Sequence, residues 1–266
     1  MALRRALLSA GVCAAGAITL SRTLGDHMVL QREKTARVWG FDTAGSTVTT
    51  TFGGAKLSTT TGADGVWRIA LPPTAAGGPY ALTFTSSAGG SVSAVDVLFG
   101  DVYVCGGQSN MQFTVASGLN ATAEIAAATY PDIRVFTVGQ GTSSNSTYVF
   151  NDLQTIEQNW TAATPASIGG AEWDTFSAIC YFFGRDVYNA LGGAVPIGLV
   201  SNNWGGTCLQ QWAPASVNQA CGKTDSGLYN AMITPYLTGP MAVTGFLWSQ
   251  VRAAWRTAPV GAPARH

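Results

Sequence analysis

Four short apolar runs in the second half of the chain constrain its fold more than any other feature. They cover residues 102–105, 133–138, 195–201 and 243–248. Each run is about as long as a strand, and its side chains are apolar on both faces. That pattern is typical of parallel strands in a sheet that is covered on both sides.

The chain between these runs predicts helices. Apolar residues recur at helical spacing at Phe176, Ile179, Phe183, Val187 and Leu191. Asp174 is a suitable N-cap for this helix, and Gly192 is a suitable end. Residues 228–236 predict a weaker helix that Pro235 cuts, and residues 139–148 predict a loop. Strands that alternate with helices predict an α/β domain with a ligand crevice at the carboxyl ends of its strands.

The first third of the chain predicts a different architecture. Its strand candidates are residues 36–40, 47–52, 66–71 and 80–84. Short strands with alternating side chains, separated by Gly and Pro, are typical of a small β-sandwich. We therefore expect a β-sandwich-like domain over residues 21–95, followed by the α/β domain over residues 96–250.

The first apolar run leads into the segment with the clearest chemistry. Gly106 and Gly107 follow the run, and Ser109 then stands between two amides, Gln108 and Asn110. Glycines let the backbone turn sharply at the end of a buried strand, which exposes the serine hydroxyl and nearby N–H groups. A nucleophilic serine and the donors to its oxyanion need that placement. The alternative is that this serine is a helix N-cap.

The composition argues against several kinds of partner. The chain has 14 Lys and Arg against 14 Asp and Glu, and only 11% of its residues are charged. Because no basic stripe could neutralise phosphates, we expect no nucleic-acid partner. Only two histidines occur, His27 and His266, and no Cys-x-x-Cys pair is present, so we expect no metal site. No long apolar run follows residue 20, so we expect no membrane span.

The N-terminus predicts export. Arg4 and Arg5 precede an apolar run over residues 6–20, and the small residues 15–17 offer a cleavage site. This order is typical of a secretory signal peptide, which we place at residues 1–20, with an N-terminal core strand or helix as the alternative. Three N-glycosylation sequons begin at Asn120, Asn145 and Asn159. Together they favour the secretory pathway, with an extracellular or lysosomal destination.

Four cysteines remain after that peptide, and they allow three pairings. We favour a disulfide between Cys208 and Cys221, which are close in sequence across a polar loop. Cys105 and Cys180 lie in apolar segments, and we expect them to be free, buried thiols.

Six segments carry a resemblance to a known family. They are residues 24–32, 99–113, 176–185, 198–207 with Trp212, 226–233 and 245–250. In this order they resemble the sialate O-acetylesterases, a branch of the SGNH-type serine esterases. The resemblance implies a flavodoxin-like, three-layer α/β/α domain, here incomplete, behind an N-terminal β domain. It also implies hydrolysis of O-acetyl esters on sialic acid or a related sugar, with release of acetate and without a metal or organic cofactor.

The resemblance also assigns roles to residues. It makes Ser109 the nucleophile. The implied oxyanion donors are the N–H of Ser109, an N–H of Gly205 or Gly206, and the side-chain amide of Gln250. Trp204 and Trp212 are either core residues or sugar-stacking ones.

One part of the family pattern is missing. The family's general base is a histidine in an Asp-x-x-His motif, which occurs nowhere in these 266 residues. The resemblance gives His27 a structural role, and His266 has no neighbouring acid. The family's Gly-Glu after Gln250 is also absent, so we expect residues 251–266 to be an aberrant tail from a frame change or an alternative exon end. A natural short tail is the alternative.

Three functions remain open at this point. Without the base we expect the esterase to be inactive or impaired, because the loss of one member of a catalytic triad lowers the rate by orders of magnitude. The chain could instead be a non-catalytic, secreted glycan-binding protein that keeps the pocket. The sugar could also differ, for example in an acetylated plant-wall or bacterial polysaccharide.

Overall fold

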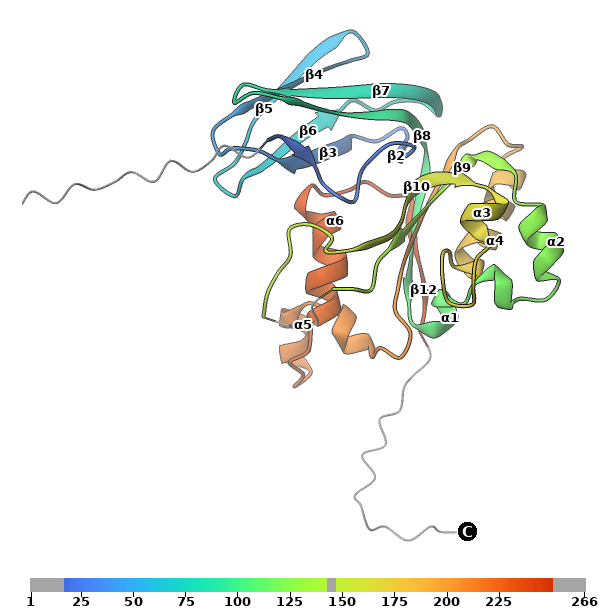
Figure 1. Ribbon diagram of the computed structural model, residues 1–266. Coiled ribbons are helices and arrows are strands. Elements are labelled where there is room, and N and C mark those ends of the chain that lie inside the picture. The colour runs from blue at the N-terminus through green and yellow to red at the C-terminus, as the bar shows by residue number, and fades with distance from the viewer. Residues whose placement is uncertain (1–16, 143–146, 251–266) are drawn as a thin grey trace, which may run out of the picture.

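The computed structural model describes residues 17–142 and 147–250 and confirms the prediction of a mixed α/β protein. The strand-rich N-terminal part lies at one end of the molecule, and the helices flank a second sheet below it (Figure 1). Among residues 17–142 and 147–250 we find no helix that could span a bilayer.

The N-terminal part packs two sheets face to face (Figure 1). One sheet holds β1 (Thr19–Leu20), β3 (Ala36–Phe41) and β6 (Val66–Leu71). The other holds β2 (Val29–Gln31), β4 (Thr47–Phe52), β5 (Ala55–Thr60), β7 (Gly77–Ser86) and the start of β8 (Ser91–Gly107). Trp67 and Phe84 meet between the sheets with ring centroids 4.9 Å apart. Each of the four predicted strands in this region is confirmed.

Strand β8 is common to both parts of the molecule. Its early residues pair antiparallel with β7, and its later residues, Asp101 to Gly107, pair parallel with β11 (Ile197–Asn203). A single strand therefore crosses the predicted boundary between residues 95 and 96. At the other predicted boundary, Ile18 is buried and β1 pairs with β3, so residues 18–20 belong to the N-terminal part. Residues 1–16 of the predicted signal peptide lie outside the described residues.

The second part is built on a mostly parallel sheet. The strand order is β10 (Ile156–Ala163), β9 (Tyr130–Val138), β11 and β8, with β12 (Gly245–Ser249) on the far side of β8. Only β10, at the edge, runs antiparallel. The four apolar runs of the sequence are β8, β9, β11 and β12, so that prediction is confirmed.

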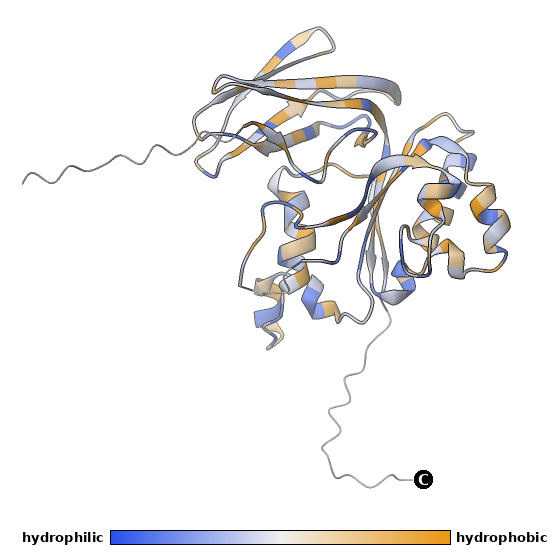
Figure 2. Cartoon of the chain, viewed as in Figure 1, coloured by the Kyte–Doolittle hydropathy of each residue, from blue (hydrophilic) through white to orange (hydrophobic). Residues whose placement is uncertain are grey.

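Helices cover both faces of this sheet. On one face lie α1 (Ser109–Gln112), η1 (Val115–Ser117), α2 (Ala121–Ala126), α3 (Pro165–Ile168) and α4 (Ala178–Ala190). On the other lie η2 (Leu209–Trp212), α5 (Ala215–Ala220), η3 (Tyr229–Ile233) and α6 (Thr234–Thr238). Successive side chains of a strand point to opposite faces of the sheet. On β11, Leu199 therefore packs against the first group of helices and Val200 against the second. Figure 2 shows apolar residues, in orange, along α4 and in the strands it covers.

Helix α4 was predicted, but its start and its buried face differ from the prediction. Ser177, not Asp174, is the N-cap, and its hydroxyl accepts a hydrogen bond from the Cys180 N–H at 3.2 Å. Ile179 is 42% exposed, whereas Gly184 is buried. A Cβ at that glycine would lie 2.4 Å from a methyl carbon of a leucine on β11. Close packing of helix on strand therefore requires glycine on the inner face, which a search for large apolar residues does not reveal.

The weaker predicted helix takes a different form. Residues Tyr229–Ile233 form one π-helical segment, and α6 follows it directly. Pro235 lies in the first turn of α6, where its missing N–H is not needed. The proline therefore opens a helix and does not cut one.

The predicted disulfide is wrong. Cys105, at the end of β8, is bonded to Cys180, in the first turn of α4, with Cα atoms 5.9 Å apart. Cys208 and Cys221 are not joined to each other. The segment between them is not a plain loop but holds η2 and α5, and these fix Cys208 as the N-cap of one helix and Cys221 as the C-cap of the other.

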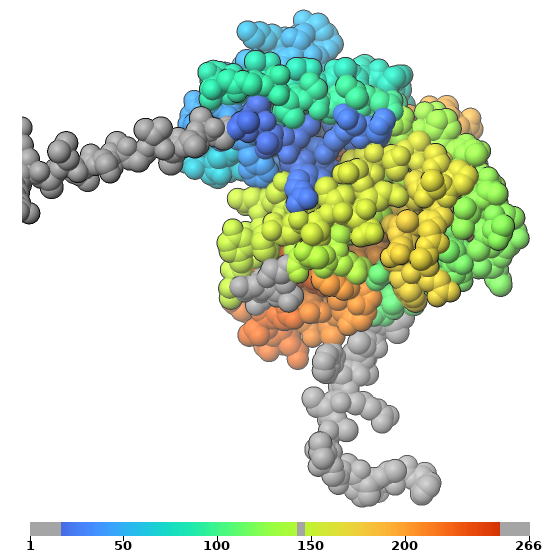
Figure 3. All heavy atoms as spheres, viewed as in Figure 1, coloured from blue at the N-terminus to red at the C-terminus, as the bar shows by residue number. Residues whose placement is uncertain are grey.

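Two polar clusters fasten the N-terminal part to the second part. Asp152 accepts hydrogen bonds from the Ser21 hydroxyl at 2.7 Å and from the Arg22 N–H at 2.9 Å. Figure 3 shows the N-terminal part, in blue and cyan, resting directly on the yellow-green and yellow segments of the second part.

The second cluster is an ion pair in which Arg32 donates two hydrogen bonds to Asp101, at 3.0 and 3.1 Å. Burial raises the pKa of Asp101, but the bonds from Arg32 outweigh it and hold that pKa below its usual value.

Candidate active site

Ser109 lies at the carboxyl end of β8, where the strand meets α1. Gly107 has a φ of +140°, and a Cβ there would lie 2.1 Å from the backbone oxygen of Ser249 on β12. A Cβ on Gly106 would lie 2.5 Å from the ring of Trp248. These glycines let β12 pass against β8 while the chain turns into the short helix, so the two-glycine prediction has a direct steric reason.

The hydroxyl of Ser109 is available for chemistry. Gln108 is the N-cap of α1 and Ser109 is its first residue, so the N-cap alternative for this serine is wrong. Its side chain is half-buried and makes no hydrogen bond within residues 17–142 and 147–250. The hydroxyl is therefore free to meet a substrate, but no described residue is hydrogen-bonded to it as the base that an activated nucleophile needs.

Gly205 is the one predicted partner that the structure places beside this serine. A Cβ built on Gly205 would lie 3.4 Å from the Ser109 Cβ. Its N–H donates to the Gln112 side-chain oxygen at 2.7 Å, so this candidate oxyanion donor is engaged in the unliganded structure. Gln112 was not predicted from the sequence. It lies three residues after Ser109 on α1, and that helical spacing was the signal that could have revealed it.

The other two predicted donors are placed differently. Gly206 has a φ of +75° and nothing lies within 4 Å of where its Cβ would be. The side-chain nitrogen of Gln250 donates to the Thr207 carbonyl at 2.8 Å, so this amide faces that carbonyl. Its side-chain oxygen is buried and has no hydrogen-bond partner among the described residues. Their role as oxyanion donors stays a prediction.

The histidine described by the structure lies away from this serine. His27 Nδ1 is 2.7 Å from Asp96, which also accepts a hydrogen bond from Arg134 at 2.6 Å. Arg134, in the middle of β9, is in register with Val102 of β8, so the cluster lies toward the amino ends of the parallel strands, whereas Ser109 follows the carboxyl end of β8. The bond from Arg134, supported by the one from His27, holds the pKa of Asp96 below its usual value. His266 lies outside the described residues.

A cavity of about 220 Å³ opens beside Gln112, at the carboxyl ends of β9 and β11. Polar side chains line it at these strand ends, among them Thr137, Ser201 and Asn203. The Thr137 hydroxyl donates to the Thr175 carbonyl at 2.6 Å, which ties the strand to the loop before α4. This is the crevice position that the parallel sheet predicted.

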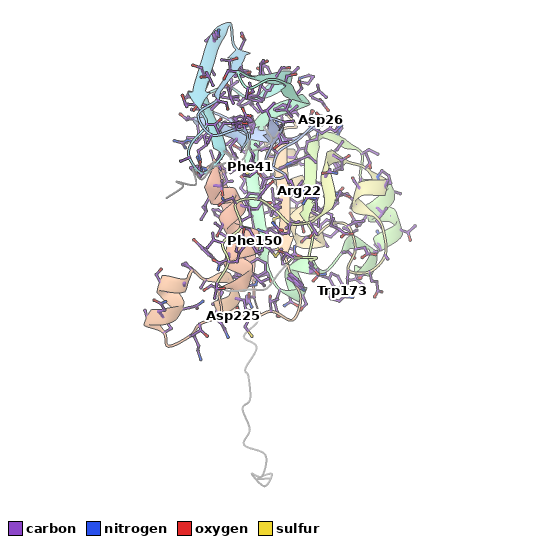
Figure 4. The ribbon with its side chains drawn as sticks, turned by 60° about the vertical axis from the view of Figure 1, so that its left-hand side comes forward. Arg22, Asp26, Phe41, Phe150, Trp173 and Asp225 are labelled. Carbon is purple, nitrogen blue, oxygen red and sulfur yellow. A yellow bond between two sulfur atoms is a disulfide. The ribbon has the colours of Figure 1, made fainter. Side chains whose placement is uncertain are left out.

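The loop before α4 forms the outer wall of the cavity. Trp173 and Thr175 both line it and both have φ near +70°, an uncommon conformation for residues with a side chain. Trp173 is 46% exposed and packs edge-on against Phe113, with ring centroids 5.9 Å apart. In Figure 4 Trp173 lies on the lower side of the second part, away from the N-terminal part. Trp212, by contrast, is buried and packs against Trp248, so it is a core residue.

Two carboxylates complete the cavity wall, Glu157 on β10 and Asp174 in the loop before α4. Within residues 17–142 and 147–250, no three Cys, His, Asp or Glu side chains come together as metal ligands would. The predicted sequons at Asn120 and Asn159 both lie on exposed positions, as glycosylation requires, and Asn145 is outside the described residues.

Comparison with known proteins places the chain in a family. A family model described as carbohydrate esterase, sialic acid-specific acetylesterase, matches residues 99–253. The sialate O-acetylesterase of Rattus norvegicus is 36% identical over 210 residues, which make up 75% of this chain and 38% of the rat protein. That of Homo sapiens is 33% identical over 253 residues, or 85% of this chain and 47% of the human protein. The chain thus spans less than half the length of these relatives.

A solved structure agrees with this match. The crystal structure of a carbohydrate acetylesterase from Xanthomonas citri superimposes with a TM-score of 0.76 at 34% identity, and the match covers 88% of this chain and 51% of that one. The chain belongs to the sialic acid-specific acetylesterase family of carbohydrate esterases.

Proposed function

We propose that this chain carries the nucleophilic half of an O-acetyl ester hydrolase of the SGNH type. The observation that carries the proposal is the Ser109 hydroxyl, which is unengaged, lies at a strand end and stands beside Gly205. Gln112, which accepts from the Gly205 N–H, lines the polar cavity next to this serine's helix. The parallel sheet between two helical layers supports the flavodoxin-like architecture implied by the family.

Under this proposal the reaction has two steps. Ser109 Oγ loses its proton to a base and forms a bond to the acetyl carbonyl carbon. The bond from that carbon to the sugar oxygen then breaks, and the sugar oxygen takes up a proton. Water attacks the acetyl-serine in the same way and releases acetate. The negative charge on the carbonyl oxygen is stabilised by the N–H groups of Ser109 and Gly205, the latter after Gln112 gives up its hydrogen bond.

The base is the missing element of this polypeptide. The 266 residues hold no Asp-x-x-His, and His27 lies toward the amino ends of the parallel strands. We propose that binding and oxyanion stabilisation alone leave a residual acceleration of about 10³–10⁴-fold over water. Hydrolysis by this polypeptide is then slow, and a base supplied from solution accelerates it.

Imidazole rescue tests this proposal. Hydrolysis of 4-methylumbelliferyl acetate is followed against imidazole concentration for the unmodified chain, for Ser109→Ala and for Ser93→Ala, a control at an exposed position on β8. We expect an imidazole-dependent rate in the unmodified chain and in Ser93→Ala, increasing with the unprotonated fraction of imidazole. Ser109→Ala should show only the rate of imidazole alone. Equal rates in all three proteins would contradict a nucleophilic role for Ser109.

A second function is supported by the cavity itself. Trp173 offers an exposed aromatic face beside polar side chains, and no described histidine faces Ser109. A glycan-binding protein without hydrolysis would keep these features. It would bind an acetylated sugar and show no imidazole-dependent release of acetate.

The cellular location is also a proposal. The basic and apolar N-terminus and the exposed sequons at Asn120 and Asn159 support entry into the secretory pathway. Secretion from a eukaryotic host as a species whose mobility changes on enzymatic removal of N-glycans would support it. An unglycosylated, retained product would contradict it.

A further inference from the structure

The cavity beside Gln112, three residues after Ser109 on α1, has two negative side chains in its described lining. Glu157 and Asp174 both line it, and both are exposed. No lysine or arginine among residues 17–142 and 147–250 lines it. The family's name refers to sialic acid, a sugar that carries a carboxylate of its own.

Three arginines of the second part and its junction are engaged elsewhere. Arg185, on α4, pairs with Glu124 at 2.6 Å, and Arg134 pairs with Asp96 toward the amino ends of the parallel strands. Arg22 donates to the carbonyls of residues 153 and 154 at the junction with the N-terminal part, and Figure 4 shows it well above Trp173. None of these could neutralise a carboxylate in the cavity without breaking its own contacts.

The same side chains suit an uncharged sugar. Carboxylates accept strong hydrogen bonds from hydroxyl groups, and Glu157 and Asp174 can take that role at the cavity rim. Thr114, Gln140 and Asn203 add donors and acceptors on the inner wall. Trp173 supplies a half-exposed aromatic surface for the apolar face of a sugar ring. The volume of about 220 Å³ equals that of about seven liquid waters, room for one sugar ring.

We infer that this cavity binds an uncharged O-acetylated sugar residue in preference to the anionic sialic acid. A sialic acid carboxylate in the cavity would face two exposed like charges with no compensating cation among the described lining residues, and this repulsion, which salt screens, disfavours it. The inference rests on the proposed function, because it takes the cavity lined by Gln112 as the sugar site for an ester attacked by Ser109. It narrows the substrate class to neutral acetylated carbohydrate.

Binding measurements on the non-hydrolysing Ser109→Ala variant test the inference. Three probes are compared by calorimetry: an O-acetylated methyl xyloside, an O-acetylated methyl sialoside, and the methyl ester of that sialoside. The ester differs from the sialoside only by the loss of the charge. We expect the xyloside to bind at least tenfold more tightly than the sialoside. The methyl ester should bind more tightly than the charged sialoside, because it lacks the carboxylate charge.

Substitutions then assign the effect to the two carboxylates. Glu157→Gln with Asp174→Asn should bring the sialoside and its ester to nearly equal affinity, whereas Asp186→Asn, an exposed acid on α4, should leave the difference unchanged. Higher salt should also narrow the difference in the unsubstituted cavity. A sialoside that binds as tightly as its ester, or the absence of binding by all three probes, would overturn the inference.

These outcomes are separate from the test of the reaction. Imidazole rescue of acetyl ester hydrolysis depends on Ser109 and not on the sugar. A positive rescue with equal binding of sialoside and ester would refute the inference alone. A failed rescue with selective binding of the neutral sugar would refute the catalytic proposal alone and favour a glycan-binding function.

Discussion

Removal of the Cys105–Cys180 disulfide should lower the stability of the protein by about 4 kcal/mol. The bond joins the strand that leads to Ser109 with the first turn of α4, across a sequence separation of 75 residues. In the chain-entropy model, release of a loop of that length gives the unfolded chain about 15 cal/mol/K more entropy, or about 4.5 kcal/mol at 25 °C. Measured losses in proteins are about 2–5 kcal/mol.

Urea unfolding measures this loss. Cys105→Ala with Cys180→Ala is compared with the unmodified chain by far-ultraviolet circular dichroism and by tryptophan fluorescence, so that both parts of the molecule are followed. With an m value of about 2 kcal/mol/M, the midpoint should fall by about 2 M. Cys221→Ala is the matched control, because that thiol is exposed and lies outside the bond, and it should change the unfolding free energy by less than about 0.5 kcal/mol.

Two results would refute this reasoning. One is a double variant within about 1 kcal/mol of the unmodified chain, since the bond would then not restrict the unfolded state as described. The other is a large loss of unfolding free energy in Cys221→Ala. That result would indicate a disulfide between Cys208 and Cys221 in place of Cys105–Cys180. A reductant should shift the unmodified chain to the midpoint of the double variant and leave the double variant unchanged.

Two further predictions concern the backbone turn and the junction. Gly107→Ala combines positive φ with a steric overlap against β12, so it should lower the unfolding free energy by about 2–4 kcal/mol. Gly54→Ala, at a positive φ in open space, should lower it by about 1 kcal/mol in the same urea experiment; equal losses would contradict the close approach of β12. Asp101→Asn should lower stability by about 2 kcal/mol at pH 7, because it weakens the charged hydrogen bonds from Arg32. The folded-state pKa of Asp101 is depressed, so its contribution is present above about pH 4 and is lost as the pH falls through that pKa; a difference between variant and parent that grows below pH 4 would contradict the argument.

The sequence predicts the elements whose signal is local. The runs that became β8, β9 and β11 are largely buried on both faces, whereas the fourth run became β12 with Phe246 and Trp248 exposed. The two glycines before Ser109 are required where β12 passes against β8. The phase of α4 was misjudged because Gly184, not a large apolar residue, faces β11. Such an inward glycine gives no hydrophobic signal.

The features that the sequence did not reveal depend on tertiary packing. Cys105 and Cys180 are distant in sequence and meet only because α4 crosses the end of β8. The predicted boundary near residue 95 falls inside β8, because this one strand pairs first with β7 of the N-terminal part and then with β11 of the second part. The amino-acid composition changes along β8, but no turn marks the change. Trp173 lies in a polar loop with no regular pattern, and only the folded loop places it on the cavity wall.

The acetylation state of Ser109 tests the central claim most directly. The purified chain is incubated with 4-nitrophenyl acetate, quenched in acid and digested, and the peptide that contains Ser109 is examined by mass spectrometry. We propose that these 266 residues, which hold no Asp-x-x-His, deacylate the serine slowly. We therefore expect an acetyl group on Ser109 that is absent in Ser109→Ala and is removed by imidazole. No acetyl group on that serine, or equal acetylation of the same peptide in Ser109→Ala, would contradict the account.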